Sequence, residues 1–331
     1  MFIAKDLTQF KNLFVSKLKN MLSDEELGTY ILVLANSLQD DYLKNELQAD
    51  LKSNFKALKE NYYAGTLKAT KDDLDVFEKL LDMDVDDLPV WKSRAEGDWL
   101  IVFNIMRQLR PARASSQVLN SIIQEFDGDK FHFNKPFLKP EILWEGEYGS
   151  KRVRVLYNKF PFSNYHLIIV VSPELNRAQV IDEEMHHFIY SLVQNESEVL
   201  PGFGVGFNSL AAGASVNHLH FQGFIRVQDF AIEVMDENSF PLKASCCISA
   251  ETAWQKIALL MQNDIAFNCL YLKGKCYIVP RVYQGCVSLP EWLDVAGWID
   301  VAGVMTVSDN EIFNDLEEVP IVQSLSLLNV E

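Results

Sequence analysis

The sequence predicts an α+β protein with an N-terminal helical region followed by a mainly antiparallel sheet with flanking helices. Two observations carry this prediction. Apolar residues recur at helical spacing through the first ninety residues, whereas short β-prone runs alternate with helical stretches from residue 131 onward. A chain of 331 residues exceeds one typical domain. We therefore expect a helical domain at 1–95 and a second, sheet-containing domain at 96–331.

The first ninety residues are expected to form helices that pack against a core or a protein partner. Ser23-Asp24-Glu25-Glu26 matches a capping box, the side-chain pattern that starts a helix. Apolar residues repeat at helical spacing from 43 to 58, and Thr70 precedes another amphipathic stretch. A further apolar helix is predicted from Trp99 to Leu109, ending at Pro111 because a proline disfavours helix at the residue before it.

Strands are expected over much of the remaining chain, separated by helices at 181–193 and 254–261. The strand predictions rest on runs of β-branched and aromatic residues bounded by turn residues. They cover 131–136, 141–144, 153–157, 166–171, 203–207, 216–226, 266–272, 276–280 and 301–307.

Composition narrows the class of protein. Hydrophobic residues make up 48% of the chain, which allows a sizeable core. No uninterrupted apolar run reaches the roughly 18 residues of a membrane span, and the N-terminus lacks the form of a signal peptide. The five cysteines include no CxxC pair, so neither a disulfide framework nor a zinc ribbon is indicated. These features predict a reduced, cytoplasmic protein that is not inserted in a membrane.

The charge is unevenly distributed along the chain. A net charge of −16 argues against general nucleic-acid binding. Residues 90–180 nevertheless carry 13 Lys and Arg against 9 Asp and Glu, whereas residues 181–331 carry 6 against 20. The positive segment would attract a small ligand that bears phosphate.

Two histidines and a glutamine are spaced two residues apart in the stretch 216–224. In a strand, His218, His220 and Gln222 would share one face, because successive side chains alternate between faces. Buried polar groups are costly without partners, so this pattern indicates a site. Small residues at 208–215 precede it and would let the backbone approach a ligand closely.

The stretch from Asn208 to Gln222 resembles the active-site signature of the transferase branch of the histidine triad superfamily. That branch includes galactose-1-phosphate uridylyltransferase, diadenosine tetraphosphate phosphorylase and the GDP-hexose phosphorylases. The stretches 157–168, 131–135 and 277–281 are similar to other parts of these proteins, so the likeness spans roughly 100–305. The resemblance implies a sheet of histidine triad type, with a catalytic half at about 125–230 and a degenerate second half at about 245–310.

A neutral imidazole is well suited to attack the innermost phosphorus of a nucleotide, giving a covalent intermediate that can be passed on. We assign this role to His220, whose other ring nitrogen must be held by an acceptor such as a backbone carbonyl. His218 would order the site, and Gln222, an amide that cannot shuttle protons, favours transfer over hydrolysis. Substrate contacts are expected from residues of the small-residue stretch, the basic segment and the last similar stretch: Asn208, Gly213, Ala214, Ser215, Asn158, Lys159, Arg110 and Arg281.

The resemblance implies a nucleotidyltransferase that cleaves a nucleoside diphosphate sugar with phosphate, without a cofactor or a metal. One alternative is a dinucleoside polyphosphate phosphorylase, and another is a non-catalytic nucleotide-binding protein that uses its N-terminal helices to contact a protein partner. Two further interpretations of His218 and His220 are open, since His-x-His is also a metal-ligand pattern and a structural pair. Monomer and homodimer are both compatible with the sequence.

Overall fold

The computed structural model describes residues 2–24, 26–109, 119–293 and 295–330. Its centre is an eight-stranded sheet in the order β3-β4-β5-β7-β6-β9-β10-β8, in which every neighbouring pair is antiparallel. The predicted α+β class is confirmed. The strands of this sheet are β3 (Ile142–Tyr148), β4 (Lys151–Tyr157), β5 (Leu167–Val171), β6 (Phe203–Asn208), β7 (Phe221–Ile225), β8 (Ser245–Cys247), β9 (Ala266–Leu272) and β10 (Lys275–Arg281).

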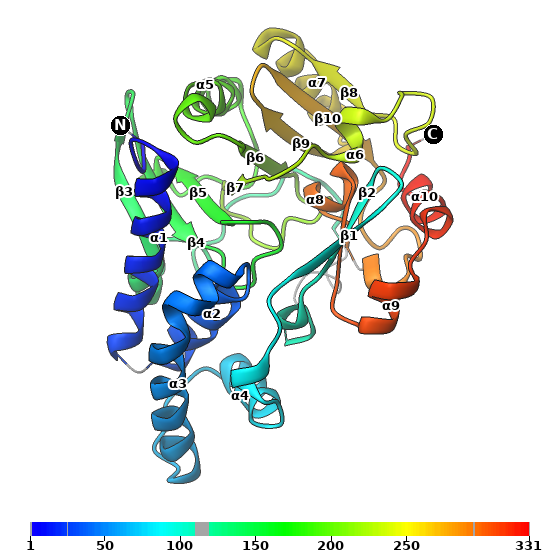
Figure 1. Ribbon diagram of the computed structural model, residues 1–331. Coiled ribbons are helices and arrows are strands. Elements are labelled where there is room, and N and C mark those ends of the chain that lie inside the picture. The colour runs from blue at the N-terminus through cyan, green and yellow to red at the C-terminus, as the bar shows by residue number, and fades with distance from the viewer. Residues whose placement is uncertain (1, 25, 110–118, 294, 331) are drawn as a thin grey trace.

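Helices cover one face of this sheet, and Figure 1 shows the N-terminal helices gathered at its β3–β4–β5 end. Alternate residues of each strand point into a single apolar cluster that includes helix residues, as where the Phe14 ring lies 4.7 Å from that of Tyr157. The N-terminal helices therefore share a core with the sheet. The helices of this layer are α1 (Leu7–Met21), α2 (Leu27–Ser37), α3 (Asp41–Tyr63), α4 (Lys71–Leu81), α5 (Glu183–Val199) and α7 (Ala250–Gln262).

A smaller sheet and the C-terminal helices pack on part of the opposite face (Figure 1). β2 pairs antiparallel with β1 and parallel with β11. Trp298 and Trp99 are fully buried in this second cluster. The elements are β1 (Lys92–Glu96), β2 (Trp99–Phe103), α6 (Ala231–Val234), α8 (Trp298–Ala302), β11 (Val304–Val307), α9 (Asn310–Asp315) and α10 (Glu318–Ser326).

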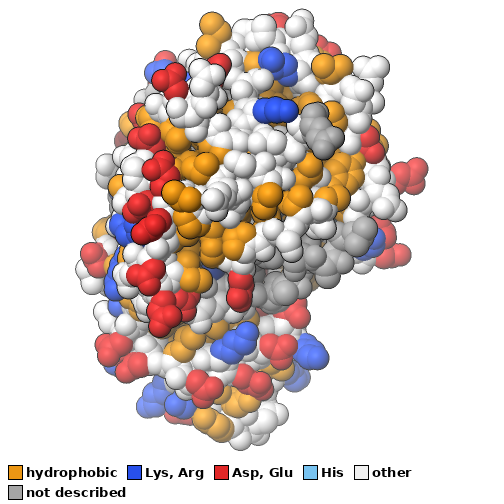
Figure 2. Space-filling view, turned by 90° about the vertical axis from the view of Figure 1, so that its right-hand side faces the viewer, with side chains coloured by type: hydrophobic (Ala, Val, Ile, Leu, Met, Phe, Trp, Pro, Cys, Tyr) orange, Lys and Arg blue, Asp and Glu red, His pale blue; other side chains and the backbone are white. Residues whose placement is uncertain are grey.

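Short 3-10 turns connect the larger elements. They are η1 (Leu22–Asp24), η2 (Val85–Asp87), η3 (Ile105–Leu109), η4 (Pro136–Glu141), η5 (Pro173–Leu175) and η6 (Glu291–Leu293). In the described part of the chain, no helix is long and apolar enough to cross a bilayer. Figure 2 shows one face on which apolar side chains gather across the middle and carboxylates line one edge, with fewer basic groups among them.

Several local predictions are wrong. Residues 99–103 form the central strand β2 rather than a helix, because an apolar run buried between two neighbours fits either structure by composition. The helix predicted to start at Ser23 begins at Leu27, with Glu26 as its N-cap residue, and the Ser23 hydroxyl donates to the Asn20 carbonyl. The strand predicted at 301–307 is divided between the end of α8 and β11. The helix predicted after Thr70 is confirmed, and the Thr70 hydroxyl caps it by accepting from the Asp73 amide.

Two corrections concern the histidine stretch directly. Residues 131–135 are irregular, because ring nitrogens of His218 and His132 accept the amides of Phe133 and Asn134 in place of a neighbouring strand. The strand predicted at 216–226 begins only at Phe221. His218 and His220 therefore precede the strand, and the alternation that predicted one shared face does not apply to them.

Candidate active site

His220 lies in the turn before β7 and is 5% exposed. Its ring Nδ1 is 2.7 Å from the carbonyl oxygen of His218. Because a carbonyl only accepts, Nδ1 carries the proton, and Nε2 keeps its lone pair. Burial lowers the pKa of His220 to about 4, against a smaller opposing effect of that carbonyl. The imidazole is therefore neutral at physiological pH, with its nucleophilic nitrogen opposite a backbone anchor.

Gln179 holds the backbone of His220 in place. Its side-chain oxygen accepts the His220 amide at 2.9 Å, and its amide nitrogen donates to the His220 carbonyl at 3.1 Å and to the Asn208 carbonyl at 2.9 Å. Gln179 is 1% exposed. One buried side chain thus ties the end of β6 to the residue before β7. Nothing in the sequence marked Gln179, since it lies in an irregular loop between η5 and α5.

His218 lies beside His220 but faces the aromatic segment. Its Nδ1 accepts the Phe133 amide at 3.2 Å, and its ring stacks on the Phe133 ring at 5.9 Å between centroids. Burial, followed by the neighbouring His220 and His132, lowers the pKa of His218 to about 3. The same Phe133 ring lies 4.8 Å from that of His220. Phe133 therefore covers both imidazoles.

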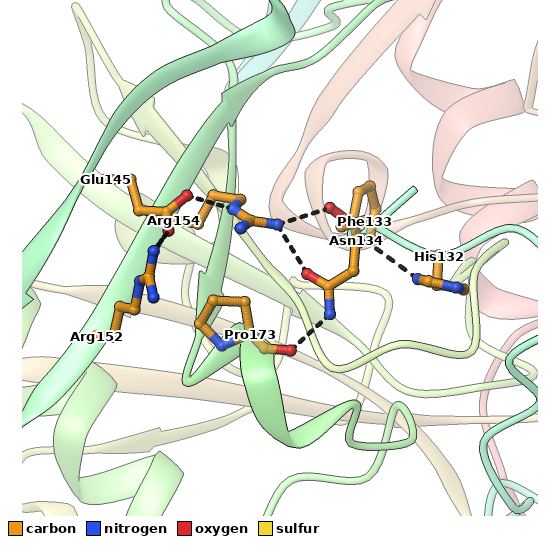
Figure 3. Close-up of polar contacts among 7 residues, drawn as sticks. All are labelled: His132, Phe133, Asn134, Glu145, Arg152, Arg154 and Pro173. Carbon is orange, nitrogen blue, oxygen red and sulfur yellow. Dashed lines mark hydrogen bonds and ion pairs between the residues drawn. The ribbon is translucent and has the colours of Figure 1, made fainter. Parts of the chain in front are cut away.

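An arginine on β4 anchors the segment that carries Phe133, as Figure 3 shows. Arg154 donates to the Phe133 carbonyl at 3.2 Å and to the Asn134 side-chain oxygen at 2.7 Å, and Asn134 donates to the Pro173 carbonyl at 2.6 Å. Arg154 also pairs with Glu145 at 2.5 Å. Burial acts to raise the pKa of Glu145, but hydrogen bonds from Arg154 and Arg152 bring it below its ordinary value. The network holds an irregular segment against the histidines.

Gln222 is fixed by two donors on the face of the sheet opposite α5. Its side-chain oxygen accepts the Trp298 indole N–H at 2.8 Å and lies 3.0 Å from Nε2 of His166. Asn208 lies nearby, because its side-chain oxygen accepts the Trp298 amide at 2.8 Å. The C-terminal segment, which contains no histidine, therefore contacts two predicted site residues.

The small-residue turn after β6 borders the same region. Gly213 has a φ of +98°, a conformation that strains residues with a side chain, and a Cβ there would lie 3.1 Å from Gly297 and 3.6 Å from the Asn208 amide nitrogen. Ala214 is buried and Ser215 is exposed. The structure thus brings Asn208, Gly213, His220 and Gln222 into one connected region.

Another predicted substrate contact, Asn158, borders this network: its side-chain nitrogen lies 3.4 Å from both ring nitrogens of His166, and its backbone carbonyl accepts from the Asn36 side chain of α2 at 2.9 Å. Lys159 instead pairs with Asp73 of α4 at 2.5 Å. Arg281 is fully buried, donates to the Ala296 carbonyl, and has a pKa lowered by burial to about 10. Arg110 lies outside the described residues. Their roles in substrate binding stay predictions.

Metal ligation is one of the two alternatives that the sequence leaves open for His218 and His220. Within residues 2–24, 26–109, 119–293 and 295–330, no three or more His, Cys, Asp or Glu side chains form a group that could hold a metal ion. Both Nδ1 atoms are engaged with backbone groups, as described above. The arrangement is suited to nucleophilic attack by Nε2 of His220.

Part of the chain is similar to known phosphorylases. Residues 78–224 match the family model described as GDPGP1-like, N-terminal domain. GDP-D-glucose phosphorylase 1 of Danio rerio is 37% identical over 132 residues, which cover 38% of this chain and 36% of that protein. GDP-L-galactose phosphorylase 1 of Arabidopsis thaliana is 25% identical over 215 residues, covering 52% and 48%. The chain thus matches only about a third to a half of the length of these curated relatives.

A solved structure shares the fold. The crystal structure of yeast Ap4A phosphorylase Apa2 superimposes with a TM-score of 0.52 at 15% sequence identity, covering 79% of this chain and 96% of that one. The likeness covers a larger share of the chain than residues 78–224 do.

Proposed function

We propose that this chain, whose residues 78–224 match the GDPGP1-like N-terminal domain, is a phosphorylase of the histidine triad type that cleaves a GDP-hexose by phosphorolysis. The products are GDP and a hexose 1-phosphate. The observation that carries the proposal is the neutral His220 imidazole, whose Nδ1–H is held by the His218 carbonyl so that Nε2 is the nucleophile. Both the guanine nucleotide and the hexose are taken from the names of the relatives.

The reaction proceeds in two displacements at the α-phosphorus. In the first, the Nε2 lone pair forms the N–P bond while the bond from phosphorus to the bridging oxygen breaks, and the hexose 1-phosphate leaves with that electron pair. In the second, an oxygen of inorganic phosphate attacks the same phosphorus, the N–P bond breaks, and GDP leaves. The Nδ1 proton stays on the ring in both steps, and the His218 carbonyl stabilises the charge that develops there.

Gln222 and Asn208 bind the transferred group in this proposal. Both side-chain oxygens are occupied by donors from the protein, so the amide nitrogens are the groups available to anionic phosphoryl oxygens. An amide does not deliver a proton to a leaving group at neutral pH, and a phosphate leaving group does not require one. This chemistry favours transfer to phosphate over transfer to water.

We also infer a cytoplasmic location. All five cysteines are free thiols, and Cys246 and Cys286 are exposed. Free, exposed thiols fit a reducing compartment.

Product analysis tests the function. The chain is incubated with GDP-glucose, UDP-glucose, ADP-glucose or diadenosine tetraphosphate, each with and without phosphate, and the products are separated by ion exchange. We expect GDP and glucose 1-phosphate from GDP-glucose, in a reaction that requires phosphate. Preferential cleavage of diadenosine tetraphosphate would replace the proposal by the dinucleoside polyphosphate alternative. Release of GMP at the same rate without phosphate would identify a hydrolase.

Arg154→Met is expected to lower phosphorolysis about tenfold, because Arg154 makes two hydrogen bonds to the segment that holds Phe133 against the histidines. Hydrogen bonds to a charged group contribute about 1.5–3 kcal/mol each, and 1.4 kcal/mol is a factor of ten. Steady-state kinetics measures the effect. Arg152→Met is the matched control, since Arg152 pairs with the same Glu145 and is 54% exposed. Equal losses in the two variants would assign the effect to the ion pair with Glu145 that both arginines share, and not to the hydrogen bonds from Arg154 to residues 133 and 134.

A further inference from the structure

Trp298 connects the C-terminal half of the chain to two residues of the proposed site. It is the first residue of α8 and is fully buried. Its indole N–H donates to the Gln222 side-chain oxygen at 2.8 Å, and its backbone amide donates to the Asn208 side-chain oxygen at 2.8 Å. Trp298 thus donates to the side-chain oxygens of both Gln222 and Asn208.

The indole ring of Trp298 packs flat on the sheet, against residues of β6 and β7. It stacks on Phe224 with 4.7 Å between ring centroids and an interplanar angle of 16°. It also lies over Gly206, where a Cβ would be 2.2 Å from the ring, and Gly206 is the partner of Gln222 in the β6–β7 ladder. Only glycine at that position lets the ring lie flat beside Gln222.

A second donor reaches the same oxygen. Nδ1 of His166 accepts the Phe162 amide at 3.3 Å, so the proton of His166 is on Nε2, which lies 3.0 Å from the Gln222 side-chain oxygen. Indole N–H is a donor only. If the amide of Gln222 turned over, its NH2 group would face two N–H donors in a buried site. The amide is therefore held in one orientation, with its NH2 group directed away from Trp298 and His166.

We propose that Trp298 is a positioning residue for nucleotidyl transfer, acting through Gln222. The proposal rests on the proposed function. By locking the side-chain oxygen, Trp298 keeps the NH2 group of Gln222 toward the phosphoryl group that His220 attacks. In the turned-over amide, the oxygen lone pairs would face phosphoryl oxygens and repel them. The segment that contains no histidine thus determines the direction of the one amide that distinguishes transfer from hydrolysis.

A double-mutant cycle tests this role. Trp298→Phe keeps a ring and removes the N–H, and we expect kcat to fall about tenfold with KM for the nucleotide sugar changed less than about twofold. Gln222→Ala is expected to cost at least as much, and adding Trp298→Phe to it should cost less than about twofold more. Independent, multiplicative losses would overturn the proposal, as would an unchanged kcat in Trp298→Phe.

Trp99→Phe is the matched control. Trp99 is 1% exposed in the same apolar cluster, and its indole nitrogen has no hydrogen-bond partner among the described residues. It undergoes the same loss of ring volume without loss of a hydrogen bond, so its kcat should stay within about twofold of the wild type. A loss equal to that of Trp298→Phe would assign the effect to packing.

An observation independent of activity separates this proposal from the proposed function. In a ¹H–¹⁵N spectrum, the indole signal absent from Trp298→Phe belongs to Trp298. In Gln222→Ala this signal should move upfield as its acceptor is lost, whereas the Trp99 signal should not move. A Trp298 signal that stays in place would contradict the hydrogen bond from its indole N–H to Gln222, even if the enzyme is active. Absence of phosphorolysis by the wild type would instead overturn the proposed function.

Discussion

Replacement of His220 by alanine is expected to abolish the covalent intermediate and to lower phosphorolysis at least about 10⁴-fold, as removal of a catalytic nucleophile does in other enzymes that use one. Its ring is the one whose Nδ1–H is held by the His218 carbonyl, which leaves Nε2 to attack. The measurement is single-turnover labelling with GDP-glucose that carries ³²P in its α-phosphate. Wild-type protein should retain an acid-labile, base-stable label, and the variant should retain none.

The pH dependence of labelling adds a second check on His220. Because burial lowers its pKa to about 4, the reactive neutral form is already complete below the ordinary histidine value of about 6.5. The labelling rate should therefore be flat from pH 8 to pH 5 and should decrease only as pH approaches 4. A midpoint near 6.5 would contradict the buried, neutral nucleophile.

His187→Ala is the control for His220→Ala. His187 lies on α5, and its ring is 3.9 Å from Glu183 at the surface. It should label at the wild-type rate. Full turnover by His220→Ala would refute the covalent mechanism.

Gln179→Ala is expected to lower the free energy of unfolding by about 3 kcal/mol or more and to reduce labelling of the folded protein at least tenfold. The substitution leaves the His220 amide, the His220 carbonyl and the Asn208 carbonyl without their buried partner. Each buried polar group left unsatisfied costs about 1–3 kcal/mol. Urea unfolding measures the stability, and labelling under native conditions measures the position of the His220 ring.

Gln194→Ala is the matched control for Gln179→Ala. Gln194 accepts a single backbone amide, that of Gly274, at an exposed turn. Its loss should cost less than about 1 kcal/mol, because water replaces the partner. If Gln179→Ala were as mild as Gln194→Ala, the loop would not support His220 as the structure indicates.

The fold class and the main elements were predictable because they follow from local patterns. Apolar spacing identified the N-terminal helices, and the β-prone run at 166–171 became β5, buried along its whole length. The helix predicted for the apolar run at 99–103 is wrong, because composition does not distinguish a buried strand from a buried helix segment. The irregular path at 131–135 was unpredictable, since distant histidine rings accept its amides.

By itself, the sequence identified the groups that we propose to react: two histidines, an amide and a small-residue turn within fifteen residues. The resemblance of this stretch to the histidine triad signature implies phosphoryl chemistry, and that resemblance depends on residue type and close spacing alone. Only the tertiary structure decided how these groups are held. Gln179, His166 and Trp298 are 29 to 90 residues from their partners Asn208, His220 and Gln222. Hydrogen bonds between such distant residues form when the chain packs, and no local pattern encodes them.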